Sequence, residues 1–353
     1  MSEIKTEYIS LSATEKIGLI SNLSTMLSAG ISILETVDSI LEDAKGNQKK
    51  ILETLRADLV QGEQLHTSFA KFPNVFDKVT VNIIRAAEEA GTLDVTLKDL
   101  RENIRKQTEF SDKVKGALIY PVVIMFVFAG VLLMILVFVI PKISSVFLRM
   151  KMKLPLPTRI LMFASNTLLT QTIPVIAIIT VVVFGFIFLY RRNKKLIINL
   201  LFSIPLLREL AKEIDLTNFT RSLYLLLNAG IPITAALDLT FDIVTKNEVA
   251  TAIRHCKDLV LSGKKLSEGF KDAKNIFPSI MIKITEAGEK SGSLDKSMQD
   301  ISEYLDYQVS KTLHTTTTLM EPLILVVVGV LVGGMMMSIL SPIYGMIGQI
   351  GAR

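Results

Sequence analysis

One eight-residue motif occurs twice in the chain, 201 positions apart. Residues 87–94 read AEEAGTLD and residues 288–295 read GEKSGSLD. The positions shared by the two copies are Glu88, Gly91, Leu93 and Asp94 in the first, and Glu289, Gly292, Leu294 and Asp295 in the second. Further matches continue upstream, so that Ala29-Gly30-Ile31 pairs with Ala229-Gly230-Ile231. The chain therefore carries two copies of a unit of about a hundred residues, each followed by an apolar run.

Hydropathy indicates a membrane protein that also has polar domains. Half of the 353 residues are hydrophobic and mean hydropathy is positive, yet 21% of the residues are charged. Three stretches lack charge for longer than the roughly 20 helical residues that cross a bilayer. They are 116–141, 160–190 and 322–352. We predict three transmembrane helices, at 117–141, 173–190 and 319–341.

The N-terminal sequence and the cysteine content are compatible with polar domains in a reducing compartment. The first eleven residues contain Glu3, Lys5 and Glu7 and no apolar run, which predicts no cleavable signal peptide. A lone cysteine, Cys256, excludes an internal disulfide. The net charge of +5 is explained by basic flanks of membrane helices, so no nucleic acid is expected as a partner.

Apolar residues recur every three or four positions, which predicts helices and no strands. Ser12 and Glu15 have the spacing of a capping box at a first helix start. Glycines at 30, 62 and 91 mark helix ends, and Asp94 is expected to cap a long sixth helix that continues toward the first span. The same pattern fits the second copy. The predicted fold class is all-α, a membrane protein with two homologous six-helix cytoplasmic bundles and three transmembrane helices.

These features divide the chain into nine segments. The polar ones are an N-terminal tail (1–12), two helical bundles (13–116 and 213–318), an extracytoplasmic loop (142–172), a cytoplasmic linker (191–212) and an extracytoplasmic tail (342–353); the three spans lie between them. Two spans lie between the bundles, so the chain crosses the membrane twice and both bundles are expected on one side. That side has eleven lysines and arginines near the spans, and the other side has six. The positive-inside rule therefore favours cytoplasmic bundles in a multi-pass protein of the cell inner membrane.

The twin acidic motif has a structural and a functional interpretation. In the structural one, Gly91 and Gly292 adopt positive φ at a helix end, the leucines tuck under the turn, and the aspartates cap the next helix. In the functional one, Glu88 and Glu289 form an exposed edge that contacts a partner or a divalent ion. Two carboxylates make a poor metal site, so Glu88 and Glu289 are only weak metal candidates and no metal or cofactor is expected.

Two dipeptides mark where the chain enters the membrane. Tyr120-Pro121 begins the first span and Glu321-Pro322 the third. An ionisable group within a bilayer is costly, at ~3 kcal/mol on insertion scales. Glu321 is thus either a residue at the membrane interface or a functional one that pairs with a pilin-like subunit or a sister protomer.

The chain lacks the sequence signals of an enzyme. There is no phosphate-binding glycine-rich loop ending in Gly-Lys-Ser or Gly-Lys-Thr. The three histidines and one cysteine are not spaced like metal ligands or a nucleophile and its base. We predict no catalytic residues.

Several motifs in a fixed order point to one family. They are the paired Glu-x-x-Gly-x-Leu-Asp motifs, Tyr-Pro and Glu-Pro before two spans, LPLPT at 154–158 and Ser341-Pro342-Ile343 near the end. Over about residues 13–346 the chain resembles the inner-membrane platform proteins of type IV pilus and type II secretion machines, the type II secretion F family.

The resemblance implies a scaffold at the centre of such a machine. Its expected partners are a hexameric secretion or pilus assembly ATPase, pilin or pseudopilin subunits, other inner-membrane assembly proteins, membrane lipid and further copies of itself. Alternative hypotheses are a membrane solute transporter, because transporters also contain internal repeats, and an adaptor that binds a cytoplasmic partner without moving anything.

Overall fold

The computed structural model describes residues 9–142, 145, 156–171, 174 and 205–350, and every regular element among them is helical. By the density of contacts it divides into two units. The first, here called the bundle unit, comprises Met1–Lys113 and Ile204–Ser310; the second, the membrane unit, comprises Val114–Ser203 and Lys311–Arg353.

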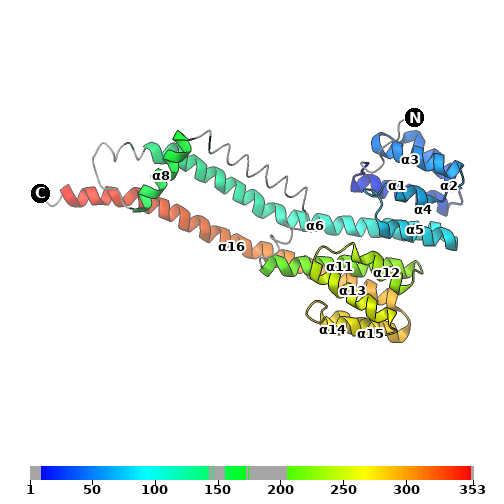
Figure 1. Ribbon diagram of the computed structural model, residues 1–353. Coiled ribbons are helices and arrows are strands. Elements are labelled where there is room, and N and C mark those ends of the chain that lie inside the picture. Colours follow the sequence, from blue (N-terminus) through cyan, green and yellow to red (C-terminus); the bar gives the residue numbers. More distant parts are fainter. Residues whose placement is uncertain (1–8, 143–144, 146–155, 172–173, 175–204, 351–353) are drawn as a thin grey trace. The chain divides into compact units, whose positions relative to one another are not determined.

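The first repeat has the six expected helices. Ser12 and Glu15 form the predicted capping box at the start of the first helix, and Gly30, Gly62 and Gly91 have φ of +83°, +83° and +68°. The helices are α1 Ala13–Ser28, α2 Ile33–Asp43, α3 Gly46–Val60, α4 Leu65–Ala70, α5 Lys78–Ala90 and α6 Leu93–Met134 (Figure 1). One expectation was wrong in detail. Because α6 begins at Leu93, Asp94 lies inside the first turn rather than at the cap, where its carboxylate still favours the positive end of the helix dipole.

The second repeat also has six helices, but its first helix is longer than expected. α11 begins at Pro205, inside the segment 191–212 that was predicted to be a linker. A proline fits the first helical position because its missing N–H would have no intrahelical acceptor there. The helices are α11 Pro205–Asn228, α12 Ile233–Phe241, α13 Asn247–Leu261, α14 Leu266–Asp272, α15 Ser279–Ser291 and α16 Leu294–Ile350.

Each repeat has its own apolar core, built around equivalent phenylalanines. In the first, the rings of Phe69 and Phe76 stack with centroids 3.9 Å apart. In the second, the equivalent rings of Phe270 and Phe277 lie 4.3 Å apart. All four side chains are fully buried, which explains why both positions retain an aromatic residue.

Helix α5 joins the two repeats within the bundle unit. Val79 and Ile83 project from α5 into the core of the second repeat, where they are 6% and 2% exposed. At the edge of this contact, Lys78 Nζ lies 2.5 Å from Asp242 Oδ2. The first repeat therefore buries one face of its fifth helix against α11 and α12 of the second.

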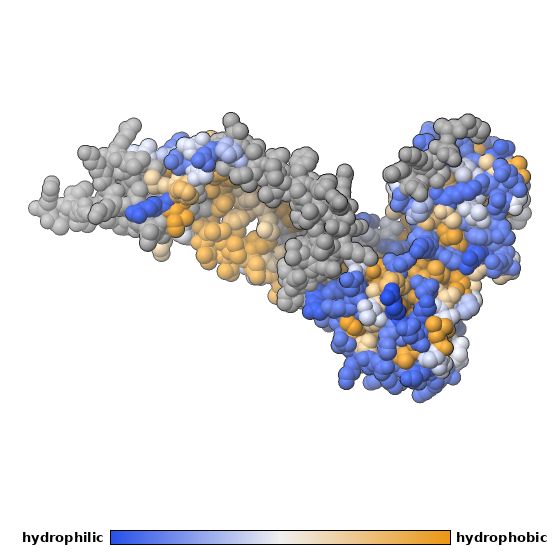
Figure 2. Space-filling view, viewed as in Figure 1, coloured by the Kyte–Doolittle hydropathy of each residue, from blue (hydrophilic) through white to orange (hydrophobic). Residues whose placement is uncertain are grey.

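The membrane unit contains the apolar parts of the two longest helices. Two helices among the described residues are long and apolar enough to cross a bilayer, Leu93–Lys142 and Leu294–Gly334, and they agree with the predicted spans at 117–141 and 319–341. On the face shown in Figure 2, the visible part of these helices is mainly hydrophobic, whereas the bundles are mainly hydrophilic. The predicted span at 173–190 lies outside the described residues apart from position 174.

A further helix of the membrane unit was not predicted. α8 (Leu156–Thr170) lies within the segment 142–172 that was assigned to a loop. It packs against a short π-helical segment, η2 (Ile135–Val139), that follows α6. The short run of mixed apolar and hydroxyl residues in α8 had given no clear helical stripe.

Candidate functional site

The motif glutamate of the first repeat caps a neighbouring helix. Glu88 lies on α5, and its carboxylate accepts hydrogen bonds from the backbone N–H groups of Leu65 (2.6 Å) and His66 (3.0 Å), the first two residues of α4. The His66 side chain adds a third contact, with Nδ1 2.7 Å from Glu88 Oε2. Helix α4 has no side-chain hydrogen bond from its own N-cap residue, Gln64, so Glu88 supplies the acceptor that its free N–H groups need.

The second repeat uses the same arrangement with a different partner. The Glu289 carboxylate accepts from the backbone N–H of Ser267 at 3.2 Å and from its hydroxyl at 2.5 Å. Ser267 is the second residue of α14, whose N-cap residue Lys265 also makes no side-chain cap. In both repeats the motif glutamate thus connects the C-terminal part of the fifth helix to the start of the fourth.

The rest of the motif shapes the turn that follows. Gly292 has φ of +71°, close to the +68° of Gly91, so both glycines adopt the left-handed conformation that ends a helix. Leu93 and Leu294 pack partly buried against the cores of their repeats. Asp295, like Asp94, lies in the first turn of the next helix. The glycines and leucines agree with the structural interpretation of the motif, whereas the aspartates lie one position inside the helix and not at its cap.

The functional interpretation requires the two motif glutamates to be exposed, and neither is fully so. The Glu88 side chain is only 15% exposed, and Glu289 is half-buried. Both carboxylates already accept hydrogen bonds from the protein. Across the described residues, no group of three or more His, Cys, Asp or Glu is arranged to hold a metal ion.

The membrane-entry residues lie inside continuous helices. Tyr120-Pro121 belongs to α6 and Glu321-Pro322 to α16, and the side chains of Tyr120 and Glu321 are exposed. Each proline removes one backbone hydrogen bond to the residue four positions earlier, but neither one ends its helix. Both helices therefore run through the predicted start of a span without a break.

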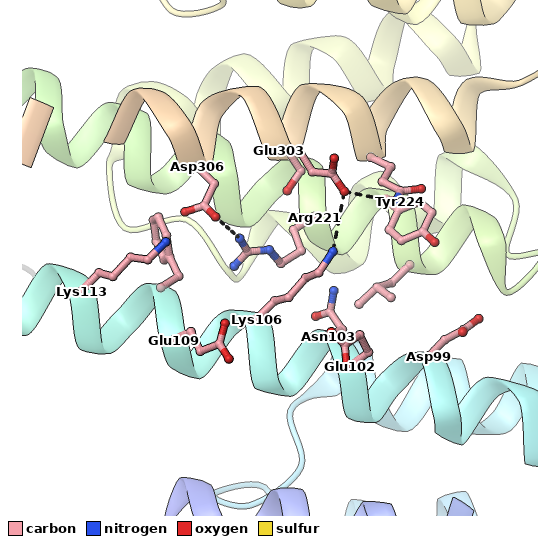
Figure 3. Close-up of a pocket in the computed structure, with 14 residues that line it drawn as sticks. Asp99, Glu102, Asn103, Lys106, Glu109, Lys113, Arg221, Tyr224, Glu303 and Asp306 are labelled. Atoms are coloured by element: carbon pink, nitrogen blue, oxygen red, sulfur yellow. Dashed lines mark hydrogen bonds and ion pairs between the residues drawn. The ribbon is translucent and has the colours of Figure 1, made fainter. Parts of the chain in front are cut away.

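A polar crevice of the bundle unit was not anticipated from the sequence. It has a volume of about 370 Å³ and lies between α6, α11 and α16 (Figure 3). Lys106 on α6 crosses it to Glu303 on α16, with 3.6 Å between Nζ and Oε1. Five carboxylates and three basic side chains line the crevice, namely Asp99, Glu102, Glu109, Glu303 and Asp306 with Lys106, Lys113 and Arg221.

Arg221 is the buried centre of this crevice. Its side chain projects from α11 between the other two helices (Figure 3) and is only 8% exposed. The guanidinium carbon lies 5.2 Å from the ring centroid of Phe110 on α6, and Nη2 lies 4.0 Å from Asp306 Oδ2 on α16. Burial lowers the pKa of Arg221, an effect that nearby Asp306 opposes. One residue of α11 thus holds both long helices.

The Arg221 contacts are incomplete. Within the described part of the chain, Nη1 of Arg221 and Oδ1 of Asp306 are buried without a hydrogen-bond partner. A separation of 4.0 Å is too long for a hydrogen bond, so the two groups attract each other only as charges. The first repeat has no such pair, because the equivalent positions are Ser21 and Arg105. A signal was present in the sequence: Arg221 interrupts the apolar stripe of Leu216, Phe219, Leu223 and Leu226.

Comparison with known proteins explains the duplication. The profile of the type II secretion system protein F family matches the chain twice, at residues 19–141 and 219–342. Each match contains one repeat and the apolar run that follows it. The chain belongs to this family.

Curated relatives of the family match nearly the whole chain. The type IV pilus assembly protein PilC of Pseudomonas aeruginosa is 30% identical over 330 residues, which cover 91% of this chain and 87% of the relative. PilC of Thermus thermophilus is 28% identical over 336 residues (94% and 82%), and the type II secretion system protein F of Aeromonas hydrophila is 26% identical over 337 residues (94% and 86%). Family membership and the two long apolar helices indicate an inner-membrane protein.

Proposed function

We propose that this chain is a polytopic inner-membrane scaffold of a type IV pilus or type II secretion machine, which couples a cytoplasmic hexameric ATPase to the assembly of pilin-like subunits. The observation that carries the proposal is the continuity of α6 and α16. Each begins in a six-helix bundle, at Leu93 or Leu294, and continues without a break into an apolar segment long enough to span the membrane. The names and the family of the relatives support the same role.

In this mechanism the two long helices carry a displacement of the bundles toward the membrane. An α-helix suits this task because its backbone hydrogen bonds run along its axis. Arg221 contacts Phe110 and Asp306, which lie within four residues of the points where α6 and α16 leave the bundle unit, at Lys113 and Ser310. A movement of α11 would therefore act on both helices together.

The incomplete contacts of Arg221 are suited to a movement of α16 relative to α11. The ion pair with Asp306 is long and each partner retains one unpaired polar atom, so a small shift of α16 toward α11 would shorten the pair at little cost in broken contacts. The exposed Lys106–Glu303 pair contributes little to stability, at ~0.2–1 kcal/mol, and would not oppose such a shift.

The orientation in the membrane is part of the proposal. Both bundles lie in the cytoplasm, where the ATPase can reach them, and a third span at 173–190 returns the chain to that side. The excess of lysine and arginine near the bundle ends of the spans supports this orientation. We further propose that the scaffold is a homo-oligomer, since a ring-shaped ATPase presents several equivalent surfaces to it.

Affinity capture of the tagged protein from mildly solubilised native membranes tests the proposed partners. We expect a secretion-type ATPase and a pilin-like protein to be recovered and identified by mass spectrometry. If neither is recovered after cross-linking, the scaffold proposal is overturned, and solute uptake becomes the activity to assay.

A variant of Arg221 tests the proposed coupling. Arg221→Met removes the charge but fills a similar volume, so we expect folding and ATPase capture to persist while surface filaments or secreted substrate fall at least tenfold. Arg254→Met is the matched control, because Arg254 also lies over a ring, 4.4 Å from the Phe241 centroid, but it is exposed and outside the crevice. Normal assembly in Arg221→Met would remove this residue from the mechanism.

A further inference from the structure

Helix α8 is fixed to the end of the first span by one buried hydrogen bond. In the π-helical segment η2 the regular α-helical hydrogen-bonding pattern is interrupted. The hydroxyl of Ser165 on α8 donates to the carbonyl of Leu136 at 2.6 Å, and Ser165 is only 3% exposed. Leu136 and Ile140 are also buried, at 7% and 3% exposed. The contact therefore sets the position of α8 along the span.

The position of Leu136 gives the depth of this contact in the membrane. The uncharged run 116–141 has 26 residues, so its middle lies near residue 128. Leu136 is eight residues farther on, about 12 Å along a helix at ~1.5 Å per residue. The hydrocarbon core extends about 15 Å from its middle. Ser165 is thus held close to the edge of the hydrocarbon core, and α8 lies with it.

The side of α8 that faces away from η2 carries an apolar strip and, directly beside it, a polar strip. Ile160 and Phe163 lie side by side on the helix and are 67% and 76% exposed. Arg159, Asn166 and Thr170 follow one another at helical spacing along an adjacent strip and are also exposed. The Thr170 hydroxyl donates to the Asn166 carbonyl at 2.6 Å and so does not require water.

The end of the first span, against which α8 packs, also exposes apolar side chains. On the neighbouring part of the first span, Leu133, Met134 and Phe138 are 48%, 55% and 63% exposed. Within Leu156–Thr170 there is no lysine, aspartate or glutamate, and Arg159 is the one charged residue. A short helix with this composition is suited to the boundary between lipid tails and headgroups.

We propose that α8 is an interfacial helix, whose Ile160 and Phe163 side chains insert among the lipid acyl chains while Arg159 and Asn166 face the headgroups. The far end of the first span is then anchored in the bilayer surface through Ser165. In this arrangement Leu156–Thr170 lies at the membrane surface and does not extend into the aqueous space.

Spin labelling of the purified full-length chain in phosphatidylethanolamine and phosphatidylglycerol vesicles tests this placement without any partner protein. Single cysteines at Ile160→Cys, Phe163→Cys and Asn166→Cys are introduced in a Cys256→Ala background. Cys256 is buried and is the one cysteine of the chain, so its replacement by alanine leaves each introduced cysteine as the single thiol available to the label. Collisions with oxygen report lipid exposure, and collisions with a neutral nickel chelate report water.

We expect labels at 160 and 163 to collide preferentially with oxygen, and the label at 166 to favour the nickel chelate. Equal nickel accessibility at all three positions would put α8 in water and overturn the proposal. Protection from both reagents at 160 and 163 would also overturn it, because these side chains would then face protein. Neither result bears on ATPase or pilin capture, so failure here is separate from failure of the proposed function.

A second variant tests the anchor. Ser165→Ala removes the hydroxyl that holds α8 to Leu136, while leaving the apolar strip intact. We expect a label at 163 to become more mobile but to keep its preference for oxygen. Unchanged mobility would show that the hydrogen bond does not fix α8, whereas a switch to nickel accessibility would show that protein contacts alone had set its depth.

Discussion

The two repeats share a framework but differ in what is attached to it. Both use a glutamate of the fifth helix to cap the fourth, a left-handed glycine to end the fifth, and a pair of phenylalanines in the core. Only the second repeat carries a buried Arg221 facing an aspartate on the long helix. The shared residues therefore maintain the bundle, and the differing ones indicate where the copies have acquired separate roles.

The contact between the repeats shows the same asymmetry. Val79 on α5 is 6% exposed because it enters the core of the second repeat, whereas its equivalent on α15, Ile280, is 38% exposed. The receiving surface also differs, since Leu225 and Ile243 of the second repeat correspond to Thr25 and Asp43 of the first. Only the second repeat has the apolar surface that binds the fifth helix of the other repeat. The contact between repeats therefore cannot extend to a further copy of the chain through α15 and the first repeat.

Removing the motif glutamates gives the largest expected effect on the shared framework. Glu88→Gln and Glu289→Gln each replace charged hydrogen bonds, worth ~1.5–3 kcal/mol, by weaker neutral ones. We expect hydrogen exchange at the start of α4 or α14 to accelerate about 10-fold to 100-fold, with the larger change at α4 because Glu88 has three contacts. Equal protection in variant and parent would contradict the capping role.

The residue just before each motif glutamate differs between the repeats, and exchanging it should destabilise the two repeats to different degrees. A Cβ added at Gly288 would lie 2.2 Å from Ser297 Oγ and 2.8 Å from Ser297 Cβ, so Gly288→Ala should destabilise the second repeat by ~1–3 kcal/mol. The first repeat has the buried Ala87 at this position, and Ala87→Gly should cost about 1 kcal/mol through helix propensity and lose the burial of one methyl group. Thermal unfolding of both variants in detergent measures the two losses of stability, and the larger loss is expected for Gly288→Ala.

Two acidic groups at equivalent positions of the repeats should respond to pH in opposite directions. Burial raises the pKa of Asp215 above its ordinary 3.8, so the folded state loses stability as pH rises from 3.8 through the raised value. Hydrogen bonds from Ser12 lower the pKa of Glu15 below 4.5, so its contribution is lost as pH falls below 4.5. Amide hydrogen exchange at the first turn of α13 reports the dependence on Asp215, and exchange at the first turn of α1 reports the dependence on Glu15. Both rates are corrected for the pH dependence of intrinsic exchange. Asp215→Asn should abolish the first dependence.

The smallest effect is expected from the exposed pair across the crevice. Lys106→Gln breaks its contact with Glu303, where both side chains are about half exposed, so stability should change by at most ~1 kcal/mol. We expect a shift in unfolding temperature of a few degrees at most, further reduced by salt. A large loss would mean that this pair, and not Arg221, holds α6 to α16.

Local patterns in the sequence predicted much of the framework. The capping box at Ser12, the left-handed glycines and the six helices of each repeat depend on neighbouring residues, and the structure confirms them. Two of the predicted spans also coincide with long apolar helices. Apolar periodicity and charge-free length carry this information because they act over one or a few helical turns.

The features that were missed depend on contacts between distant residues. Glu88 acts on a helix that begins more than twenty positions earlier, and the Arg221 contacts join helices from both repeats. α8 is held by a hydrogen bond to a carbonyl 29 positions away. None of these pairings produces a local pattern, although a buried arginine within an apolar stripe was a visible sign.

In the proposed mechanism, α6 and α16 transmit movement of the bundles into the membrane. Inserting two glycines after Lys113 tests it most directly, because each weakens the helix by ~1 kcal/mol at the point where α6 leaves the bundle unit. The control carries the same insertion after Lys45, between α2 and α3. In native cells that lack the chromosomal copy, we expect the first variant to retain ATPase capture but assemble no filaments, and the control to assemble normally. Normal assembly with the insertion after Lys113 would contradict the account.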